Sequence, residues 1–442
     1  MNEEFNKVFI EQEQQYIKGF KTRYKLTDEV YSKKQKEIDD LLSKISLYQK
    51  NDKIYLKDED FEKLRELSST SGGFLTMSNR QKIYKLILCY EPFNQDINYY
   101  NTIWINKNDS TLIFKREPLK MSFNSNPDRR VINADVERSN INRYFKKEED
   151  SKMNEKLKQE FEFALNTLIT FNNNEFNYYQ GYHDIAFIFF VLFYDDQKTF
   201  ISLFQRFTEL FLKENTIKQE EGKGFSFDVC LKFFGYILQK INLLTYNNIL
   251  KYIGTEPPFV ISYILCLFTH DIDDIFLLMR LLDFFIMNNS LSVFVLVGYI
   301  TVTEVGKILA KNIGKSFMSF FQSDDNQEKL NISDFYMHFK EIDFSIFDWE
   351  KLMKDSNKFL NQFNYDDLAK KFITENQFEP YYPLLKKEGY IEKMIKMNNQ
   401  IYKTYVVPKD KGVLGISTGI IISLIIILGV SIYLGKLKVW KK

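Results

Sequence analysis

The sequence predicts an all-α fold, with one further helix that crosses a membrane near the C-terminus. The chain has only 17 glycines and 8 prolines in 442 residues, which is little material for the many tight turns of sandwiches and barrels. Apolar residues recur at helical spacing over long stretches. Residues 413–434, VLGISTGIIISLIIILGVSIYL, contain no charged side chain, and about 20 helical residues are enough to cross the hydrocarbon core of a bilayer.

The composition is that of a globular protein with balanced charge. Hydrophobic residues make up 45% and charged residues 27% of the chain, and the length suffices for one large core or two smaller ones. The chain has 60 basic and 59 acidic residues, so it lacks the positive surplus that nucleic-acid binding needs. We therefore expect no nucleic-acid partner.

The cysteines and histidines do not predict a metal site. Cys89, Cys230 and Cys266 are far apart and lie in apolar stretches, where a free cysteine behaves as a small buried hydrophobe. No CxxC motif occurs, and three histidines are too few for a convincing metal cluster. This usage of cysteine favours a reducing, cytosolic setting for the folded part.

The two ends of the chain predict a tail-anchored protein. Residues 1–5, MNEEF, are charged and lack the apolar segment of a signal peptide. Residues 435–442 form a short basic tail after the predicted span, and such a late span is inserted after translation. We expect the N-terminal bulk to stay in the cytosol, although lysines on both flanks leave the positive-inside rule indecisive.

The chain divides into five predicted segments. Residues 1–58 form a helical extension in which Thr27 is the candidate N-cap of an amphipathic helix that packs on the main domain. Residues 59–310 form the main helical domain. Residues 311–408 form a helical C-terminal region that either completes the domain or tethers it to the membrane. The span at 413–434 and the tail at 435–442 follow.

Three apolar stretches within 59–310 predict buried helices. Residues 185–194, IAFIFFVLFY, are apolar all round but too short for a membrane span. Residues 259–268 follow the break at Pro257 and Pro258 and predict a second apolar helix. Residues 281–302 are divided by polar residues at 288–290, so we interpret them as two core helices and not as a membrane helix.

The first motif that carries chemistry is Ile132, Asp135 and Arg138. These residues are spaced by three and lie along one arc of a helix. Ile132 can enter the core, and Asp135 can hold Arg138 in an i,i+3 ion pair. A guanidinium group fixed in this way is suited to a phosphate oxygen. Taken alone, the pattern also fits a surface salt bridge.

The second motif is Tyr178, Gln180 and Gly181. The three asparagines at 172–174 indicate a loop, so Gln180 should lie on a loop directly before the apolar helix at 185–194. An amide that both donates and accepts can orient a water molecule, and Gly181 permits close backbone approach. Taken alone, this pattern also fits an ordinary loop.

Together, IxxDxxR and YxQ about 40 residues apart resemble the TBC domain, the catalytic domain of Rab GTPase-activating proteins. The form YYQGYHDI, at 178–185, is similar to the membrane-anchored branch of that family, numbered member 20 in animals. Flanking stretches also match, although Tyr84 stands where family members usually have Trp. These stretches lie at residues 64–67, 72–74, 79–84, 257–259, 268–270 and 280–285.

The resemblance implies a GTPase-activating protein with a multi-helical TBC-type domain. It implies that Arg138 and Gln180 form the catalytic pair, that Ile132 and Asp135 support the arginine, and that Tyr178 and Gly181 support the glutamine. It also implies a Rab partner that brings its own GTP and Mg²⁺. The branch implies a location at the endoplasmic reticulum and a Rab of early secretory traffic.

Other functions remain as alternatives. A catalytically idle TBC-like scaffold would bind a Rab or tether membranes, and a helical membrane-anchored adaptor would contact no GTPase. The sequence has no GxxxxGK[ST] or GxGxxG motif, and its GxSxG match at 415–419 lies inside the predicted membrane span, so neither a serine hydrolase nor a nucleotide site of its own is predicted. The sequence does not specify which Rab binds, the oligomeric state, or the roles of 1–58 and 311–408.

Overall fold

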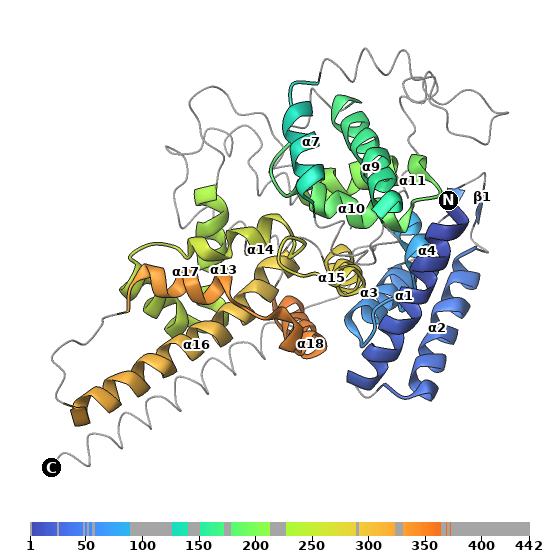
Figure 1. Ribbon diagram of the computed structural model, residues 1–442. Helices are drawn as coiled ribbons and strands as arrows, with labels where there is room; N and C mark the ends of the chain where they lie inside the picture. Colours follow the sequence, from blue (N-terminus) through green and yellow to red (C-terminus); the bar gives the residue numbers. More distant parts are fainter. Residues whose placement is uncertain are drawn as a thin grey trace. The chain divides into compact units, whose positions relative to one another are not determined.

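In the computed structural model, the described secondary structure consists of helices and one short hairpin (Figure 1). The structure describes residues 2–23, 26–46, 49–50, 53–54, 58–88, 126–139, 151–171, 178–212, 227–288, 291–322 and 330–363, with Leu368 and Phe372. Residues 1–405 form one compact unit and 406–442 a second. The predicted span at 413–434, the basic tail at 435–442 and Cys89 lie outside the described residues.

The helices of the first unit follow one another along the chain in three parts. The N-terminal part contains α1 (Asn2–Arg23), α2 (Asp28–Ser46), the antiparallel strands β1 (Gln49–Lys50) and β2 (Lys53–Ile54), α3 (Asp58–Ser69) and α4 (Met77–Leu88). The middle part contains α7 (Arg129–Arg138), α9 (Ser151–Phe171), α10 (Tyr182–Leu192), α11 (Gln197–Phe207) and the π-helical turn η2 (Thr208–Leu212). The last part contains α13 (Phe227–Ile253), η3 (Pro258–Val260), α14 (Ile261–Leu265), α15 (Ile275–Asn288), α16 (Leu291–Gln322), α17 (Ile332–Lys340), η4 (Phe344–Ile346) and α18 (Trp349–Gln362).

The predicted N-terminal helix is confirmed as α2. The Thr27 hydroxyl oxygen accepts a hydrogen bond from the Val30 backbone N–H at 3.3 Å, which satisfies one of the donors that a helix start leaves free. Ile38, Leu41 and Ile45 are buried, as the apolar stripe predicts. The domain boundaries at 58 and 310 stay predictions, and packing contacts run across both of them.

Helix α10 is the apolar helix predicted at 185–194, and all its side chains are buried. Its packing is largely aromatic. The Phe189 ring lies 5.2 Å from Phe204 and 4.9 Å from Phe207, measured between centroids. Because aromatic rings bury large areas, the 42 phenylalanines of the chain supply much of the core around α10.

The apolar stretch at 281–302 forms parts of two core helices, as predicted. Helix α15 ends at Asn288 and α16 begins at Leu291. One helix among the described residues, Leu291–Asn312, is long and apolar enough to cross a membrane, and 61% of its most apolar window is buried inside the protein. Helix α16 packs against α13 and α18, which favours the interpretation as a core helix.

The prediction of one helix over 259–268 is wrong. A 3-10 turn at Pro258–Val260 leads into the five-residue helix α14, which ends at Leu265. Leu267 and Phe268 then have positive φ angles of 50° and 66°, and such backbone does not continue a right-handed helix. The Phe268 ring stacks on Tyr263 and meets Trp349 edge-on, so core packing holds this turn in place.

Two buried ion pairs join segments that are distant in the sequence. Arg80 of α4 donates to both carboxylate oxygens of Asp283 of α15 at 2.9–3.1 Å. The Tyr84 hydroxyl donates to the same carboxylate at 2.7 Å. Arg280 pairs with both oxygens of Glu350 of α18 at 2.8 Å. A buried charge needs such a partner, so these pairs fix α4 and α18 against α15.

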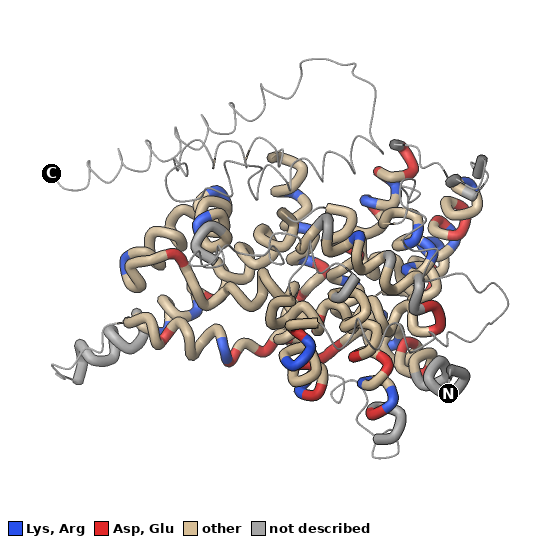
Figure 2. Tube along the Cα trace, turned by 90° about the horizontal axis from the view of Figure 1, so that it is seen from above, with Lys and Arg blue, Asp and Glu red and all other residues tan. Residues whose placement is uncertain are grey.

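Lys34 ties α2 to the C-terminal end of α3. Its ammonium group donates to the backbone oxygens of Leu67, Thr70 and Ser71 at 2.7–3.0 Å, and to the Thr70 hydroxyl at 2.9 Å. Burial and the nearby Arg280 guanidinium lower the pKa of Lys34 to about 7. On the surface the charges are mixed, and Figure 2 shows Lys and Arg interspersed with Asp and Glu along the helices.

Candidate functional site

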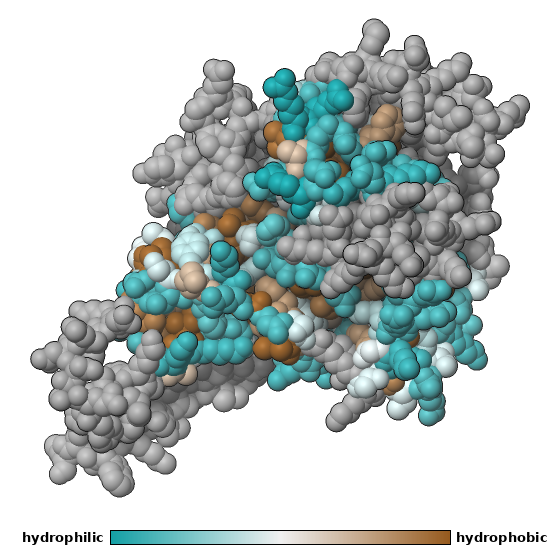
Figure 3. All heavy atoms as spheres, in the orientation of Figure 1, coloured by the Kyte–Doolittle hydropathy of each residue, from teal (hydrophilic) through white to brown (hydrophobic). Residues whose placement is uncertain are grey.

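Helix α7 presents Arg138 at its last position. Ile132 is fully buried and anchors the helix, while the Arg138 side chain is 69% exposed. The guanidinium Nε donates to the Ala134 backbone oxygen at 3.0 Å, and Nη2 pairs with Asp135 Oδ1. The predicted i,i+3 pair is therefore present, and it restrains a side chain that still faces solvent. Hydrophilic side chains gather over α7 in Figure 3.

Gln180 lies on the turn that leads into α10, as predicted, and its side chain is exposed. Gly181 is the N-cap of α10 and has a φ angle of +97°. A Cβ atom at Gly181 would overlap the Cys266 sulfur, so the backbone approaches the end of α14 as closely as glycine permits. The Tyr179 hydroxyl donates to the Leu265 backbone oxygen at 3.1 Å, which fixes the same turn against α14.

One carboxylate joins the two motifs. Asp135 is 3% exposed and binds Arg138 through Oδ1. Its second oxygen, Oδ2, lies 2.9 Å from the Tyr178 hydroxyl. The Tyr178 backbone N–H also donates to Asp128 Oδ2 at 3.3 Å, just before α7. The Arg138 helix and the Gln180 loop are thus held against each other by hydrogen bonds.

Three further residues belong to this network: His183, Asp184 and His270. From the sequence, His183 was expected only to be a polar residue at the start of a helix. His183 is buried, with Nδ1 2.8 Å from the Tyr178 hydroxyl oxygen and Nε2 3.2 Å from Asp184 Oδ1. On the far side, His270 Nδ1 lies 3.7 Å from Asp184 Oδ2. The adjacent His183 and Asp184 were the sequence feature that could have indicated this network. Their contacts with Tyr178 and His270 depend on the fold, however, and a single sequence does not reveal them.

The protonation equilibria of this network follow from its burial. Burial lowers the pKa of His183, although Asp184 and Asp135 act in the opposite direction. Burial, together with the neighbouring Asp135 carboxylate, raises the pKa of Tyr178 far above its usual value. Tyr178 is therefore a neutral hydroxyl at every physiological pH, and it has one proton to donate.

The cysteines in the described part of the chain are buried thiols, as predicted. Burial raises the pKa of Cys230 to about 12, and burial also raises the pKa of Cys266. A thiol that stays protonated is a poor nucleophile. Within the described ranges, no three His, Cys, Asp or Glu side chains are grouped so that they could hold a metal ion.

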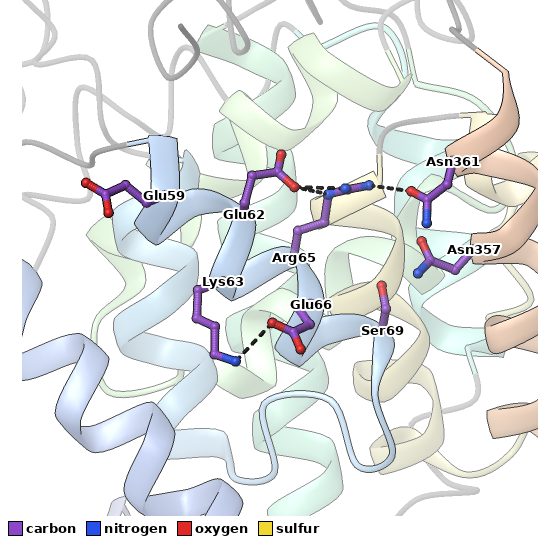
Figure 4. A pocket seen from close by; sticks show the side chains of 8 residues that line it. All are labelled: Glu59, Glu62, Lys63, Arg65, Glu66, Ser69, Asn357 and Asn361. Atoms are coloured by element: carbon purple, nitrogen blue, oxygen red, sulfur yellow. Dashed lines mark hydrogen bonds and ion pairs between the residues drawn. The ribbon is translucent and has the colours of Figure 1, made fainter. Parts of the chain in front are cut away.

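A polar recess lies between α3 and α18, away from these motifs (Figure 4). It is lined by Glu59, Glu62, Lys63, Arg65, Glu66, Ser69, Asn357 and Asn361. Four of its five charged groups are paired: Arg65 bonds to Glu62 and Lys63 to Glu66, and Arg65 also bonds to the Asn361 amide oxygen. We do not assign a ligand to this recess, because both of its cationic groups are already paired with carboxylates.

The central part of the chain matches a known protein family. A family model described as the Rab-GTPase-TBC domain matches residues 77–306. The matched region is more than half of the 442-residue chain, and it contains α7, the Gln180 turn and α10. No curated protein matches the chain.

Proposed function

Because the chain belongs to the Rab-GTPase-TBC family, we propose that it accelerates GTP hydrolysis by a Rab small GTPase with two residues inserted in trans, Arg138 and Gln180. Family membership indicates a Rab partner and GTPase activation in general. The assignment of the two residues rests on the arrangement of α7 and the Gln180 turn.

Arg138 would act on the transferring phosphoryl group. GTP hydrolysis develops charge on the bridging oxygen and on the nonbridging oxygens of the leaving and transferring phosphates, and a planar guanidinium can bind two oxygens at once. Arg138 is exposed and already restrained by Asp135, so less freedom is lost when it enters the GTPase site. An arginine finger contributes about 10³–10⁵ in rate.

Gln180 would position the attacking water. Its amide carries both a donor and an acceptor, and it is exposed on a turn whose neighbours, Tyr179 and Gly181, are fixed against α14. An amide held in this way can take the place of the glutamine that a small GTPase uses for the same purpose. It would act mainly in the transition state, and so on kcat more than on binding.

The chain would need no nucleotide or metal of its own. In this mechanism GTP and Mg²⁺ are bound by the Rab, and the protein supplies only side chains. The observation that carries the proposal is the shared Asp135 carboxylate, which binds Arg138 on one oxygen and Tyr178 on the other. This arrangement gives a physical reason for the presence of both motifs in one chain.

We further propose that residues 413–434 anchor the protein to a membrane, with the helical domain in the cytosol. The support is an uncharged run of bilayer length flanked by lysines. The similarity of YYQGYHDI to the membrane-anchored branch suggests the endoplasmic reticulum and a Rab of early secretory traffic. Deletion of 409–442 should release the protein from membranes that have been washed with alkaline carbonate.

A panel of purified Rabs tests the function. Each Rab is loaded with GTP and mixed with the full chain in detergent, and phosphate release is followed. We expect at least one Rab to respond strongly, and the Arg138→Ala/Gln180→Ala double variant to give no stimulation while it still binds that Rab. A chain that binds a GTP-loaded Rab without stimulating it would be a scaffold, and a chain that binds none would be an adaptor.

A further inference from the structure

We propose that Val131 and Ala134 form a docking strip for the Rab on the exposed face of α7, and that this strip binds the surface of the GTPase next to the γ-phosphate. The inference rests on the proposed function. It adds to the two fingers a surface along which the partner binds, and it gives that surface a preference for the GTP-bound form of the partner.

Helical geometry places the strip and Arg138 on one face of α7. Arg138 follows Val131 by seven residues, which is about 10 Å along the helix axis and about 20° around it. Ala134 lies between them, and all three residues are exposed, Val131 to 51%. The buried side of the helix consists of Ile132, Asp135 and Val136.

The Arg138 side chain folds back along this strip. Its Nε donates to the Ala134 backbone oxygen at 3.0 Å, and helical side chains in general lean towards the N-terminus of their helix. The guanidinium group is therefore held beside Ala134, one turn before the end of α7. A GTPase whose phosphates reach this group must lie against the exposed face that leads to Val131.

The chemistry of the face fits a protein partner. Val131 and Ala134 are apolar, and the exposed charged residues Arg130 and Glu137 border them. Lys158 of α9 already pairs with the Glu137 carboxylate at 3.3 Å. A small apolar centre with a charged rim is typical of protein–protein interfaces. The single methyl group of Ala134 also leaves room for a partner to approach the guanidinium closely.

The position of Val131 distinguishes it from the other exposed apolar side chains. Within the part of the chain that the structure describes, the other large apolar side chains that are exposed lie on α1, α2, α13, α17 and η4. Val131 shares its helix and its face with the residue that we assign as the arginine finger. The Rab is therefore the occupant that the geometry favours for this strip.

The nucleotide state of the Rab should control the contact. In small GTPases the γ-phosphate and its Mg²⁺ hold the switch loops in order, and hydrolysis releases these loops. Arg138 acts next to the γ-phosphate, so the GTPase surface within about 10 Å of it includes these loops. We expect Val131 to contact an ordered switch loop in the GTP-bound Rab and to lose that contact in the GDP-bound Rab.

Binding measurements test the strip without the fingers. The full chain in detergent carries Arg138→Ala and Gln180→Ala, so GTP is not consumed, and its Kd for the responsive Rab is measured by interferometry. Val131→Asp should raise the Kd for the GTP-loaded Rab about tenfold or more, because it places a carboxylate in the interface. Val131→Ala removes two methyl groups that are half exposed and should raise this Kd about fourfold. The Kd for the GDP-loaded Rab should change about twofold or less.

Val30 provides the matched control. It is 49% exposed and is the third residue of α2, as Val131 is the third residue of α7. An aspartate in the first turn is favoured by the helix dipole, and alanine has a higher helix propensity than valine. None of the four single variants should therefore lower the melting temperature, and Val30→Asp and Val30→Ala should leave the Kd for the Rab unchanged.

Kinetics with intact fingers separate docking from catalysis. Val131→Asp in the otherwise unchanged chain should raise KM for the GTP-loaded Rab and leave kcat within about twofold, because the contact is the same in the ground state and the transition state. A fall in kcat with KM unchanged would show that Val131 acts on the fingers, and would overturn the docking role.

The outcomes separate this inference from the proposed function. If the wild type binds no GTP-loaded Rab, the proposed function fails and the strip fails with it. If a Rab is bound and Val131→Asp binds it as tightly as Val30→Asp does, or weakens the GTP-loaded and GDP-loaded forms equally, the inference alone is wrong. It is also wrong if light scattering shows that Val131→Asp separates copies of this chain while the Kd for the Rab stays the same. If Arg138→Ala keeps the wild-type rate while Val131→Asp weakens Rab binding, the finger assignment fails and the docking strip stands.

Discussion

Replacement of Gly181 by alanine tests how closely the Gln180 turn must approach α14. The φ angle of Gly181 is +97°, and its Cβ would overlap the Cys266 sulfur. A side chain in left-handed backbone costs about 1–2 kcal/mol, and overpacking a core costs about 1–3 kcal/mol more. We therefore expect Gly181→Ala to lower the free energy of unfolding by about 2–5 kcal/mol and to slow stimulated hydrolysis as Gln180 shifts.

Gly254 offers a matched control for the backbone part of this effect. It has a φ angle of +79°, but an added Cβ there would meet no atom within 4 Å. Gly254→Ala should therefore lower the free energy of unfolding by only about 1–2 kcal/mol. Cys266→Ala in the Gly181→Ala background removes the sulfur and should recover part of the loss that the overlap causes, but not the part due to φ.

Urea unfolding of the four proteins, followed by far-UV circular dichroism, measures these differences. Phosphate release from the responsive Rab is measured in parallel. The reasoning is refuted if Gly181→Ala is no less stable than Gly254→Ala. It is also refuted if Cys266→Ala fails to restore any stability to the Gly181→Ala protein.

Three further predictions concern the carboxylates and the buried lysine. Asp135→Asn keeps the shape of the side chain but removes the charge that holds Arg138, so kcat should fall about tenfold with little change in melting temperature. A large fall in melting temperature together with the loss of kcat would contradict this prediction. Asp283→Ala leaves Arg80 buried without its partner and should destabilise the protein by about 3–5 kcal/mol. Asp355 pairs with Lys358 at 2.7 Å on the surface of α18, and the loss of this exposed pair in Asp355→Ala should cost about 1 kcal/mol or less in the same urea assay. Burial lowers the pKa of Lys34 in the folded protein to about 7, so above that pH the unfolded chain binds more protons than the folded one. Between about pH 7 and 9 the free energy of unfolding of the wild type should therefore rise more steeply with pH than that of Lys34→Met. Equal slopes of unfolding free energy against pH would refute this prediction.

The sequence predicted the parts of the fold that depend on local pattern. The cap at Thr27, the apolar helix at 185–194 and the division at residue 288 all follow from composition and spacing, and the structure confirms them. The pair between Asp135 and Arg138 could also be predicted, because i,i+3 spacing on a helix brings the two side chains together without reference to the rest of the chain.

The features that the sequence did not predict depend on contacts between distant segments. Gly181 needs to be glycine because Cys266, 85 residues later, lies against it, and no local signal marks that contact. The positive φ angles at Leu267 and Phe268 oppose a helical pattern and are held by aromatic packing against α18. Likewise, Arg80 and Asp283 are 203 residues apart, and their pairing is a property of the fold alone.

Phosphate release by the Arg138→Ala variant, measured on the Rab that responds most strongly, tests the central claim most directly. Arg138 is exposed and lies outside the core, so the variant should keep its fold and its melting temperature. We predict a loss of about 10²–10⁴ in the stimulated rate, and Arg138→Lys should retain at most a small remainder because it lacks the planar fork. A wild-type rate from Arg138→Ala would contradict the account.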